Sequence, residues 1–111
     1  MKHFLVLYIG STDAPAKWEA TEEQRQAGMN GWMKWATDNS ASIVDGGSPL
    51  GTTKRVGKNG VSDIRNRITA YTIVQAETYD TAANLFLGHP HFAIFPGDSV
   101  EVMECLSMPK A

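Results

Sequence analysis

The stretch Phe4-Leu-Val-Leu-Tyr-Ile9 decides the fold of this 111-residue chain. Every position is apolar, most are β-branched or aromatic, and Gly10-Ser-Thr-Asp13 ends the run, which is typical of a strand. Side chains alternate along a strand, so both faces of this one are apolar: Phe4, Val6 and Tyr8 on one face, and Leu5, Leu7 and Ile9 on the other. We therefore expect a strand that is covered on both sides.

A helix is expected to follow this strand. Thr21 and Gln24 have the spacing of a capping box, in which the hydroxyl accepts from one backbone amide and the glutamine reaches back to another. Apolar residues then recur at helical spacing through Trp32 and Trp35, and Asp38-Asn-Ser40 ends the pattern.

The rest of the chain predicts three more strands and one more helix. In order, these are a strand over 42–45, a turn at 46–49, a loop or ragged hairpin over 51–63, a strand over 67–76, a helix over 79–87 capped by Thr78, a left-handed Gly88, and a strand over 100–106. The order β-α-β-β-α-β predicts one ferredoxin-like α+β domain over residues 1–111, an antiparallel sheet with both helices on one face.

The first strand also predicts an assembly. A sheet with helices on one face only should alternate between apolar and polar side chains, and Phe4–Ile9 does not. The chain has no spare helix to cover the second face. We therefore expect a homodimer in which two sheets face each other across a two-fold axis, forming a dimeric α+β barrel.

Composition excludes some classes of partner. The net charge is −2 and the basic residues are scattered, apart from Lys54, Arg55 and Lys58, so nucleic acid is not expected. The apolar run at the N-terminus is too short for a membrane span. Cys105 is the only cysteine, which rules out an intrachain disulfide and favours a reducing compartment, so we expect a cytoplasmic protein.

Four motifs, in order, resemble the YCII-related family, and the pair Trp32 and Trp35 fits its DGPF-like branch. They are Val44-Asp-Gly-Gly-Ser-Pro-Leu50, Tyr71-Thr-Ile-Val-Gln-Ala76, Gly88-His-Pro-His91 and Val100-Glu-Val-Met-Glu104. The resemblance implies a dimeric α+β barrel and little about activity. Asp63-Ile-Arg-Asn66 stands where many DGPF-like members have Asp-Gly-Pro-Phe, and the His–Asp pair proposed as catalytic in short YCII members is not reproduced here.

His89 and His91 are the first candidates for chemistry, because imidazole exchanges protons near neutral pH. His89 follows the predicted helix end, where the helix dipole would favour its protonated form. The alternative is that His89 only caps exposed carbonyl groups and that His91 has a surface or edge role. With Glu101 or Glu104 the pair could in principle hold a metal, but the spacing matches no strong metal motif. We expect neither a metal nor a cofactor.

The last strand and the aromatic residues provide further candidates. Glu101 and Glu104 should lie on opposite faces of their strand, so one of them points toward covered interior, where Glu104 could act in catalysis or pair with Arg65 or Arg67. Possible ligand contacts are Tyr8, Tyr71, Trp18, Trp32, Trp35 and Glu101. Core packing is the more common role of such tyrosines and is favoured by the spacing of Trp32 and Trp35, and the alternative for Glu101 is a salt bridge at the strand end.

Two functions remain open from sequence. In the first, a small organic molecule, aromatic in one version, is held between the sheet and the first helix, and His89, His91 or Glu104 transfers protons without a cofactor. In the second, the protein is a non-catalytic ligand-binding or protein-interaction module whose histidines are structural. The fold alone does not decide between them.

Overall fold

The computed structural model describes residues 1–10, 21–93 and 97–108. Its elements in chain order are β1 (Lys2–Gly10), α1 (Glu22–Asp38), a short 3-10 helix η1 (Ser40–Ser42), β2 (Ile43–Pro49), β3 (Thr53–Gly57), β4 (Gly60–Ile64), β5 (Ile68–Ala76), α2 (Tyr79–Asn84), α3 (Pro90–Ala93) and β6 (Gly97–Glu104). None of the helices in these ranges has both the length and the apolar composition that crossing a membrane requires.

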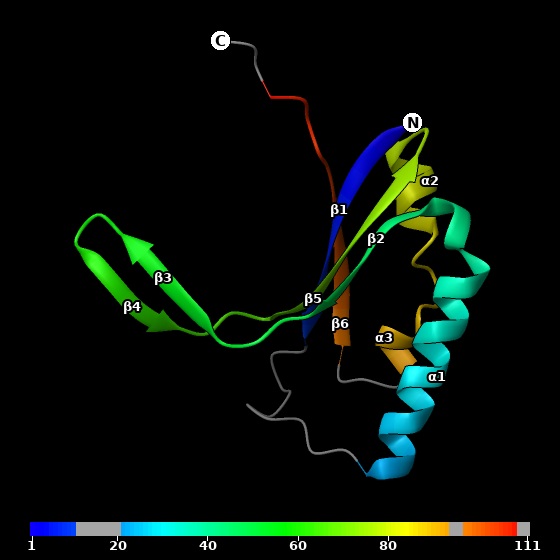
Figure 1. Cartoon of the computed structure of the whole chain (residues 1–111), viewed down its shortest axis with the longest axis horizontal. Helices are drawn as coiled ribbons and strands as arrows, with labels where there is room; N and C mark the ends of the chain where they lie inside the picture. The colour runs from blue at the N-terminus through cyan, green and yellow to red at the C-terminus, as the bar shows by residue number, and fades with distance from the viewer. Residues whose placement is uncertain (11–20, 94–96, 109–111) are drawn as a thin grey trace.

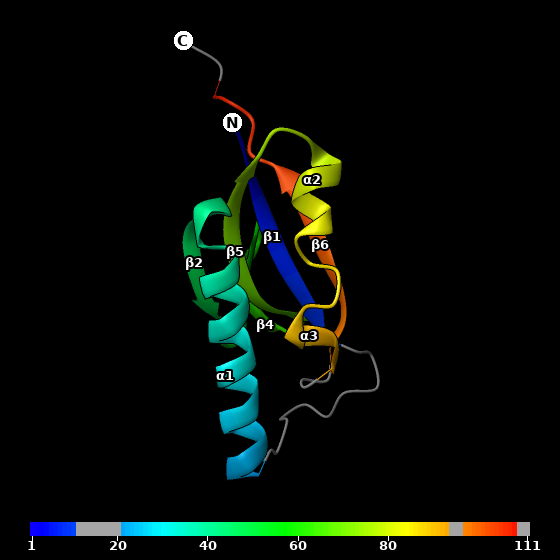
Figure 2. The same ribbon diagram turned by 90° about the vertical axis from the view of Figure 1, so that its right-hand side faces the viewer.

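Four strands form the main sheet in the order β2-β5-β1-β6, and every neighbouring pair is antiparallel. All three α-helices lie on one face of this sheet (Figure 2). Without the inserted β3–β4 hairpin, the order is that of a ferredoxin-like βαββαβ unit. The predicted α+β fold is therefore confirmed, with both longer helices on the same side.

The two faces of the sheet have different surroundings. On the helix side, alternate residues of β1 and β5 are buried, including Phe4, Val6 and Val74, and they pack against Ala82 and Phe86 from the α2 region. On the opposite side, cross-strand rows join Ile73, Leu5 and Met103, and then Tyr71, Leu7 and Glu101. We call this second surface the open face; its apolar side chains are half-buried or exposed.

Helix α1 begins where the capping pattern predicted. Thr21 accepts from the Gln24 amide at 3.1 Å, and the Gln24 side chain accepts from the Thr21 amide at 2.9 Å. The helix contacts the core through Trp32 and Trp35, and the Trp35 indole N–H donates to the Leu85 carbonyl at 2.9 Å. Large aromatic side chains hold this helix to the sheet, and they set the distance between the two.

The segment predicted as a loop or ragged hairpin is a regular hairpin. β3 and β4 pair residue by residue from Thr53 with Ile64 to Gly57 with Gly60, and they form a sheet of their own. We call residues 53–65 the arm. It projects from the side of the main sheet that faces away from the helices: helices and arm lie on opposite sides in Figure 1, and the arm is behind the sheet in Figure 2.

Several boundaries differ from the sequence-based expectation; the last strand, for example, is Gly97–Glu104 and not 100–106. The predicted turn at Gly46–Pro49 is part of β2, which continues through a bulge. The second helix ends at Asn84 and continues as turns to Gly88, whose φ of 71° confirms the predicted left-handed residue. Pro90 is not what stops that helix, which ends earlier; it starts α3 instead, because proline is favoured in the first turn of a helix.

Candidate functional site

A cavity of about 600 Å³ separates α1 from the β2–β5 half of the sheet. Its described lining is Gly28, Met29, Trp32, Met33, Gly46, Gly47, Ser48, Pro49, Thr69, Ala70, Tyr71 and His91. No Lys, Arg, Asp or Glu is among them, so the lining carries no permanent charge. Volumes of roughly 300–1,000 Å³ with apolar walls and few polar groups are usual for small-molecule sites.

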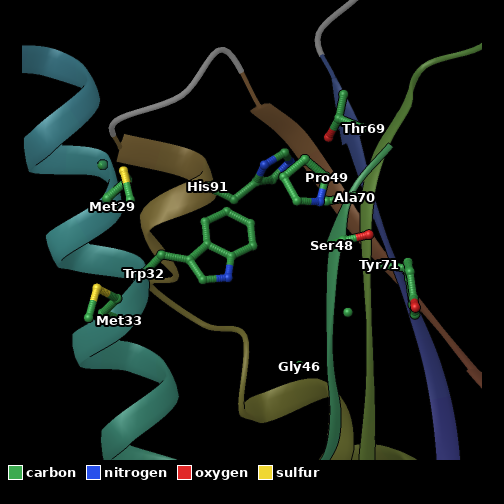
Figure 3. A pocket seen from close by; sticks show the side chains of 12 residues that line it. Met29, Trp32, Met33, Gly46, Ser48, Pro49, Thr69, Ala70, Tyr71 and His91 are labelled. Atoms are coloured by element: carbon green, nitrogen blue, oxygen red, sulfur yellow. The ribbon is translucent and has the colours of Figure 1, made fainter. Parts of the chain in front are cut away.

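One wall of the cavity is a face of α1. Met29, Trp32 and Met33 occupy consecutive turns and extend toward the sheet (Figure 3). Met29 is 58% exposed and Met33 is 64% exposed, so neither is fixed by packing. Methionine is flexible and polarisable, and it adapts to apolar ligands of different shape.

The opposite wall is backbone-rich because β2 bulges there. Gly47 has φ of 71°, and a Cβ on it would stand 1.7 Å from the Tyr71 carbonyl oxygen, so only glycine fits. Its amide donates to the Asp45 carboxylate at 2.8 Å. The Gly46-Gly47 pair thus allows β2 and β5 to approach each other closely. The part of the wall that the two glycines form has no side chains projecting into the cavity.

His91 is the one imidazole on the described lining. It is buried, and its Nε2 lies 2.9 Å from the Ile9 carbonyl oxygen. A carbonyl oxygen can only accept, so Nε2 carries the proton, and in the neutral ring Nδ1 holds the lone pair. The alternative that His91 lies at the surface is therefore wrong.

Gly97, the first residue of β6, gives the His91 ring its space. A Cβ at position 97 would lie 2.5 Å from Nε2, 2.6 Å from Cδ2 and 2.4 Å from the carbonyl oxygen of His91. Real Cβ atoms do not approach other atoms this closely. Any side chain at position 97 would therefore push the imidazole away from Ile9.

His89 lies beside His91 but belongs to the core. It is 0% exposed and is surrounded by the rings of Tyr8, Trp32, Trp35 and Phe86, with centroids between 4.5 and 5.8 Å away. Its Nδ1 accepts from the His91 backbone amide at 3.0 Å, so the Nδ1 atom is unprotonated. Its Nε2 has no hydrogen-bond partner in the described part of the chain.

Burial, with a smaller contribution from the neighbouring His91, lowers the pKa of His89 from 6.5 to about 4. The expectation that a helix dipole favours its charged form is wrong, because desolvation outweighs the dipole of a very short helix. The capping alternative is also wrong, because the ring accepts from an amide instead of donating to carbonyl groups.

The two tyrosines predicted near a ligand are placed differently. Tyr8 is buried, and its hydroxyl lies 3.0 Å from that of Thr72, which confirms a core residue with a satisfied hydroxyl. Burial raises its pKa to about 12. Tyr71 borders the cavity by its backbone, while its ring lies in the open-face row with Leu7 and points away from Trp32 (Figure 3). Among the predicted contacts that the structure describes, only Trp32 presents its ring to the cavity.

The glutamates do not join the histidines. The register puts Glu101 opposite Leu7 on the open face and Glu104 opposite Phe4 on the helix side, which confirms the expected alternation. Glu104 ends β6 and His91 lies at its start, and at about 3.3 Å per residue the two are on the order of 20 Å apart. Neither glutamate forms an ion pair within the described ranges; Arg67 instead donates to the Gly10 carbonyl at 3.5 Å.

Most of the residues that line the cavity cannot be recognised as such from the sequence. Met29 and Met33 flank Trp32 at helical spacing, which reads as core packing, and Gly46-Gly47 reads as a turn. Gly97 gives no sequence signal at all. Trp18 lies outside the described residues. Within those residues, no three His, Cys, Asp or Glu side chains converge as a metal site would need, and Cys105 is exposed.

The fold and cavity define a ferredoxin-like α+β protein with an apolar pocket between its longest helix and its sheet. Among solved structures, the chain is similar to 5-chloro-2-hydroxyhydroquinone dehydrochlorinase from Burkholderia phenoliruptrix AC1100, in complex with 2,5-dihydroxybenzoquinone. The TM-score is 0.53 at 16% identity, covering 90% of this chain and 89% of the other. At that identity the likeness shows the fold alone. No family model and no curated protein matches the chain, so membership of the YCII-related family stays a prediction.

Proposed function

We propose that this protein binds a small, uncharged aromatic molecule in the cavity beside α1, and that His91 exchanges a proton with it. The observation that carries the proposal is a single imidazole of fixed tautomer on a described lining that is mostly apolar and has no Lys, Arg, Asp or Glu. The similar solved structure holds a hydroxylated six-membered ring, which agrees with an aromatic or quinone-like ligand of this size. The family resemblance and a cytoplasmic location remain part of this proposal.

His91 suits acid–base chemistry in its present setting. Ile9 engages Nε2, and Gly97 closes the Nε2–Cδ2 edge of the ring, so the opposite edge with Nδ1 is the one that can meet a ligand. No hydrogen bond to Nδ1 occurs within the described chain. A neutral Nδ1 accepts a proton from a phenol-type or enol-type hydroxyl and can return it, which is general acid–base catalysis.

A non-catalytic binding module is the second candidate, and His89 favours it. This histidine is fully buried, holds the His91 backbone and is not part of the cavity lining. Its role is structural. If His91 likewise only ties α3 to the Ile9 carbonyl of β1, the cavity binds its ligand without changing it. The two candidates differ in what Nδ1 of His91 contacts.

Binding of matched chlorinated rings tests the site. We expect 4-chlorophenol to bind more tightly than 4-chlorobenzoate by tenfold or more, because the lining offers no cation to replace the water around a carboxylate. Met33→Glu should weaken 4-chlorophenol binding by tenfold or more, since it places a charge on the cavity wall. Trp32 fluorescence or calorimetry reports the affinity. Tighter binding of the benzoate would contradict the proposal.

The role of Nδ1 is tested with chlorobenzene, which lacks the hydroxyl. Wild-type protein should prefer 4-chlorophenol over chlorobenzene by about tenfold, corresponding to one hydrogen bond of ~1.4 kcal/mol. His91→Gln should reduce that preference, and His3→Gln, which changes an exposed histidine outside the cavity, should not. An unchanged preference in His91→Gln would favour the non-catalytic module.

We also propose that the open face is covered by a second copy in a homodimer. Leu5 lies between Ile73 and Met103, and Leu7 lies beside Tyr71, so apolar side chains span three strands. A contiguous apolar surface of this kind is uncommon on a monomer. A two-fold axis through it buries the same residues on both copies.

Leu7→Asp should convert the dimer into a monomer. Leu7 is half-exposed in a single chain, so the change costs the monomer little, whereas a carboxylate buried between two sheets costs several kcal/mol. Sedimentation velocity measures the change in mass. Asn84→Asp, at the exposed end of α2 on the other side of the sheet, is the matched control. A wild-type protein that is monomeric at every concentration contradicts the dimer.

A further inference from the structure

The arm and the open face together form the two sides of a corner. The arm leaves the main sheet after β2 and returns into β5, and it stands out on the open-face side (Figures 1 and 2). We propose that the arm clasps a second copy of this chain, so that each subunit of the dimer sits between the open face and the arm of the other. This inference rests on the homodimer proposed above.

The arm lacks cover in a single chain. Within the described residues its two strands pair only with each other, and a two-stranded hairpin by itself is at best marginally stable in water. Val56 and Val61 lie directly opposite each other on one face of it, and they are 78% and 64% exposed. Ile64 at its base is exposed as well. An apolar cross-strand pair on a projecting hairpin indicates a surface that another body covers.

The direction in which the arm projects favours a second copy of this chain as the molecule that covers it. A second copy laid on the open face enters the corner between sheet and arm, because that is the side on which the arm stands. Two-fold symmetry then places the partner's arm beside the first copy in the same way. A strand rises about 3.3 Å per residue, so five paired residues extend roughly 17 Å, which exceeds the ~10 Å between packed layers.

The distribution of charged residues also favours a second copy of this chain as the partner of the arm. Residues 53–65 contain four of the ten Lys and Arg residues but one of the twelve Asp and Glu residues, so the arm is positive and the remainder of the chain is negative. Glu101 is exposed on the open face itself. Opposite charges on the two surfaces steer like chains together and oppose a stacking in which two arms meet. Lys54 is already paired with Asp63, which weakens the case for a nucleic-acid partner.

The double variant Val56→Ser, Val61→Ser tests the arm. It removes the apolar pair without adding charge, and we expect the dimer dissociation constant to rise at least tenfold in sedimentation equilibrium. Leu87→Ser removes an exposed leucine that follows α2 and should leave the constant unchanged. If the double variant dimerises like wild type, the arm is not part of the interface, and the sheet-face dimer stands without it. If wild type never dimerises, both proposals fail.

Hydrogen exchange of the wild-type protein provides a second test, which holds even if the hairpin of the double variant does not form. The amides of β3 and β4 should exchange at least tenfold more slowly above the dimer dissociation constant than well below it. Amides in α2, on the far side of the sheet, are the internal reference and should not change. Equal exchange of the arm at both concentrations would overturn the proposal.

Discussion

Acidification from pH 7 to pH 4 is expected to lower the free energy of unfolding by about 3 kcal/mol through His89 alone. The pKa of this buried imidazole is about 4 in the folded chain, against 6.5 for an ordinary histidine. Between those values the unfolded chain binds the extra proton and the folded chain does not. Stability is therefore full above pH 6.5 and is lost as the pH falls toward 4.

Protonation of His89 is unfavourable in the folded chain for two physical reasons. Nδ1 of His89 accepts from the His91 amide, and a proton on Nδ1 would replace that bond with a repulsive contact between two donors. The charge would also stand among four aromatic rings with no counter-ion recorded in the described residues. The proton therefore favours the unfolded chain.

Chemical denaturation at pH 7, 5.5 and 4, followed by tryptophan fluorescence, measures this loss. His89→Phe keeps a ring in the cage and removes the titrating group, so its stability should change less with pH than that of wild type by about 3 kcal/mol. At pH 7 the variant itself should be less stable by about 1–3 kcal/mol, because the His91 amide loses its acceptor. His3→Gln controls for the exposed histidine. Equal pH dependence in wild type and His89→Phe would show that His89 is not the sensor.

Gly97→Ala is expected to abolish the phenol preference of the cavity while leaving the cavity walls in place. The added Cβ would fall within 2.6 Å of three His91 atoms, so the ring must move away from the Ile9 carbonyl. Overpacking of this kind costs about 1–3 kcal/mol of stability. Affinity for 4-chlorophenol should fall about tenfold to the level of His91→Gln, and affinity for chlorobenzene should stay the same.

Gly51→Ala is the matched control for this prediction. Gly51 is not among the described lining residues, and an added Cβ there meets nothing within 4 Å, so binding and stability should be retained. Imidazole nitrogen chemical shifts give a second measurement. The wild-type His91 ring should show the proton on Nε2, and Gly97→Ala should show a mixture of tautomers. A fixed Nε2 tautomer in Gly97→Ala, with binding unchanged, would mean that Gly97 does not position the ring.

Local chemistry made several elements predictable. The capping box at Thr21 and Gln24, the Thr78 cap and the left-handed Gly88 all occur as expected, because each depends on residues within one turn. The alternation of Glu101 and Glu104 follows from strand geometry. From the sequence, the bulge at Gly47 looks like a turn. The glycine indicates an unusual backbone position, but the sequence does not show which carbonyl group approaches it.

The candidate site was predictable only in part. The sequence directed attention to His89 and His91, yet it could not show that one ring is sealed in the core and the other borders a cavity. Their chemistry differs because of the Ile9 carbonyl, 82 residues from His91 in sequence, and the tryptophans of α1, more than 50 residues from His89. The Gly97 backbone, six residues from His91, also constrains that ring. Residues separated by more than 50 positions have no mutual signal in a single sequence.

The sequence by itself determined the order of the four main-sheet strands and the two longer helices, the helix caps and the apolar character of both faces of β1, because these depend on neighbours within a few residues. The tertiary structure alone decided that α1 stands off the sheet and leaves a cavity, that His91 carries its proton on Nε2, and that the arm projects from the open face. Each of these depends on atoms brought together from distant parts of the chain. Side-chain volume and hydrogen-bond geometry, not local propensity, settle such contacts.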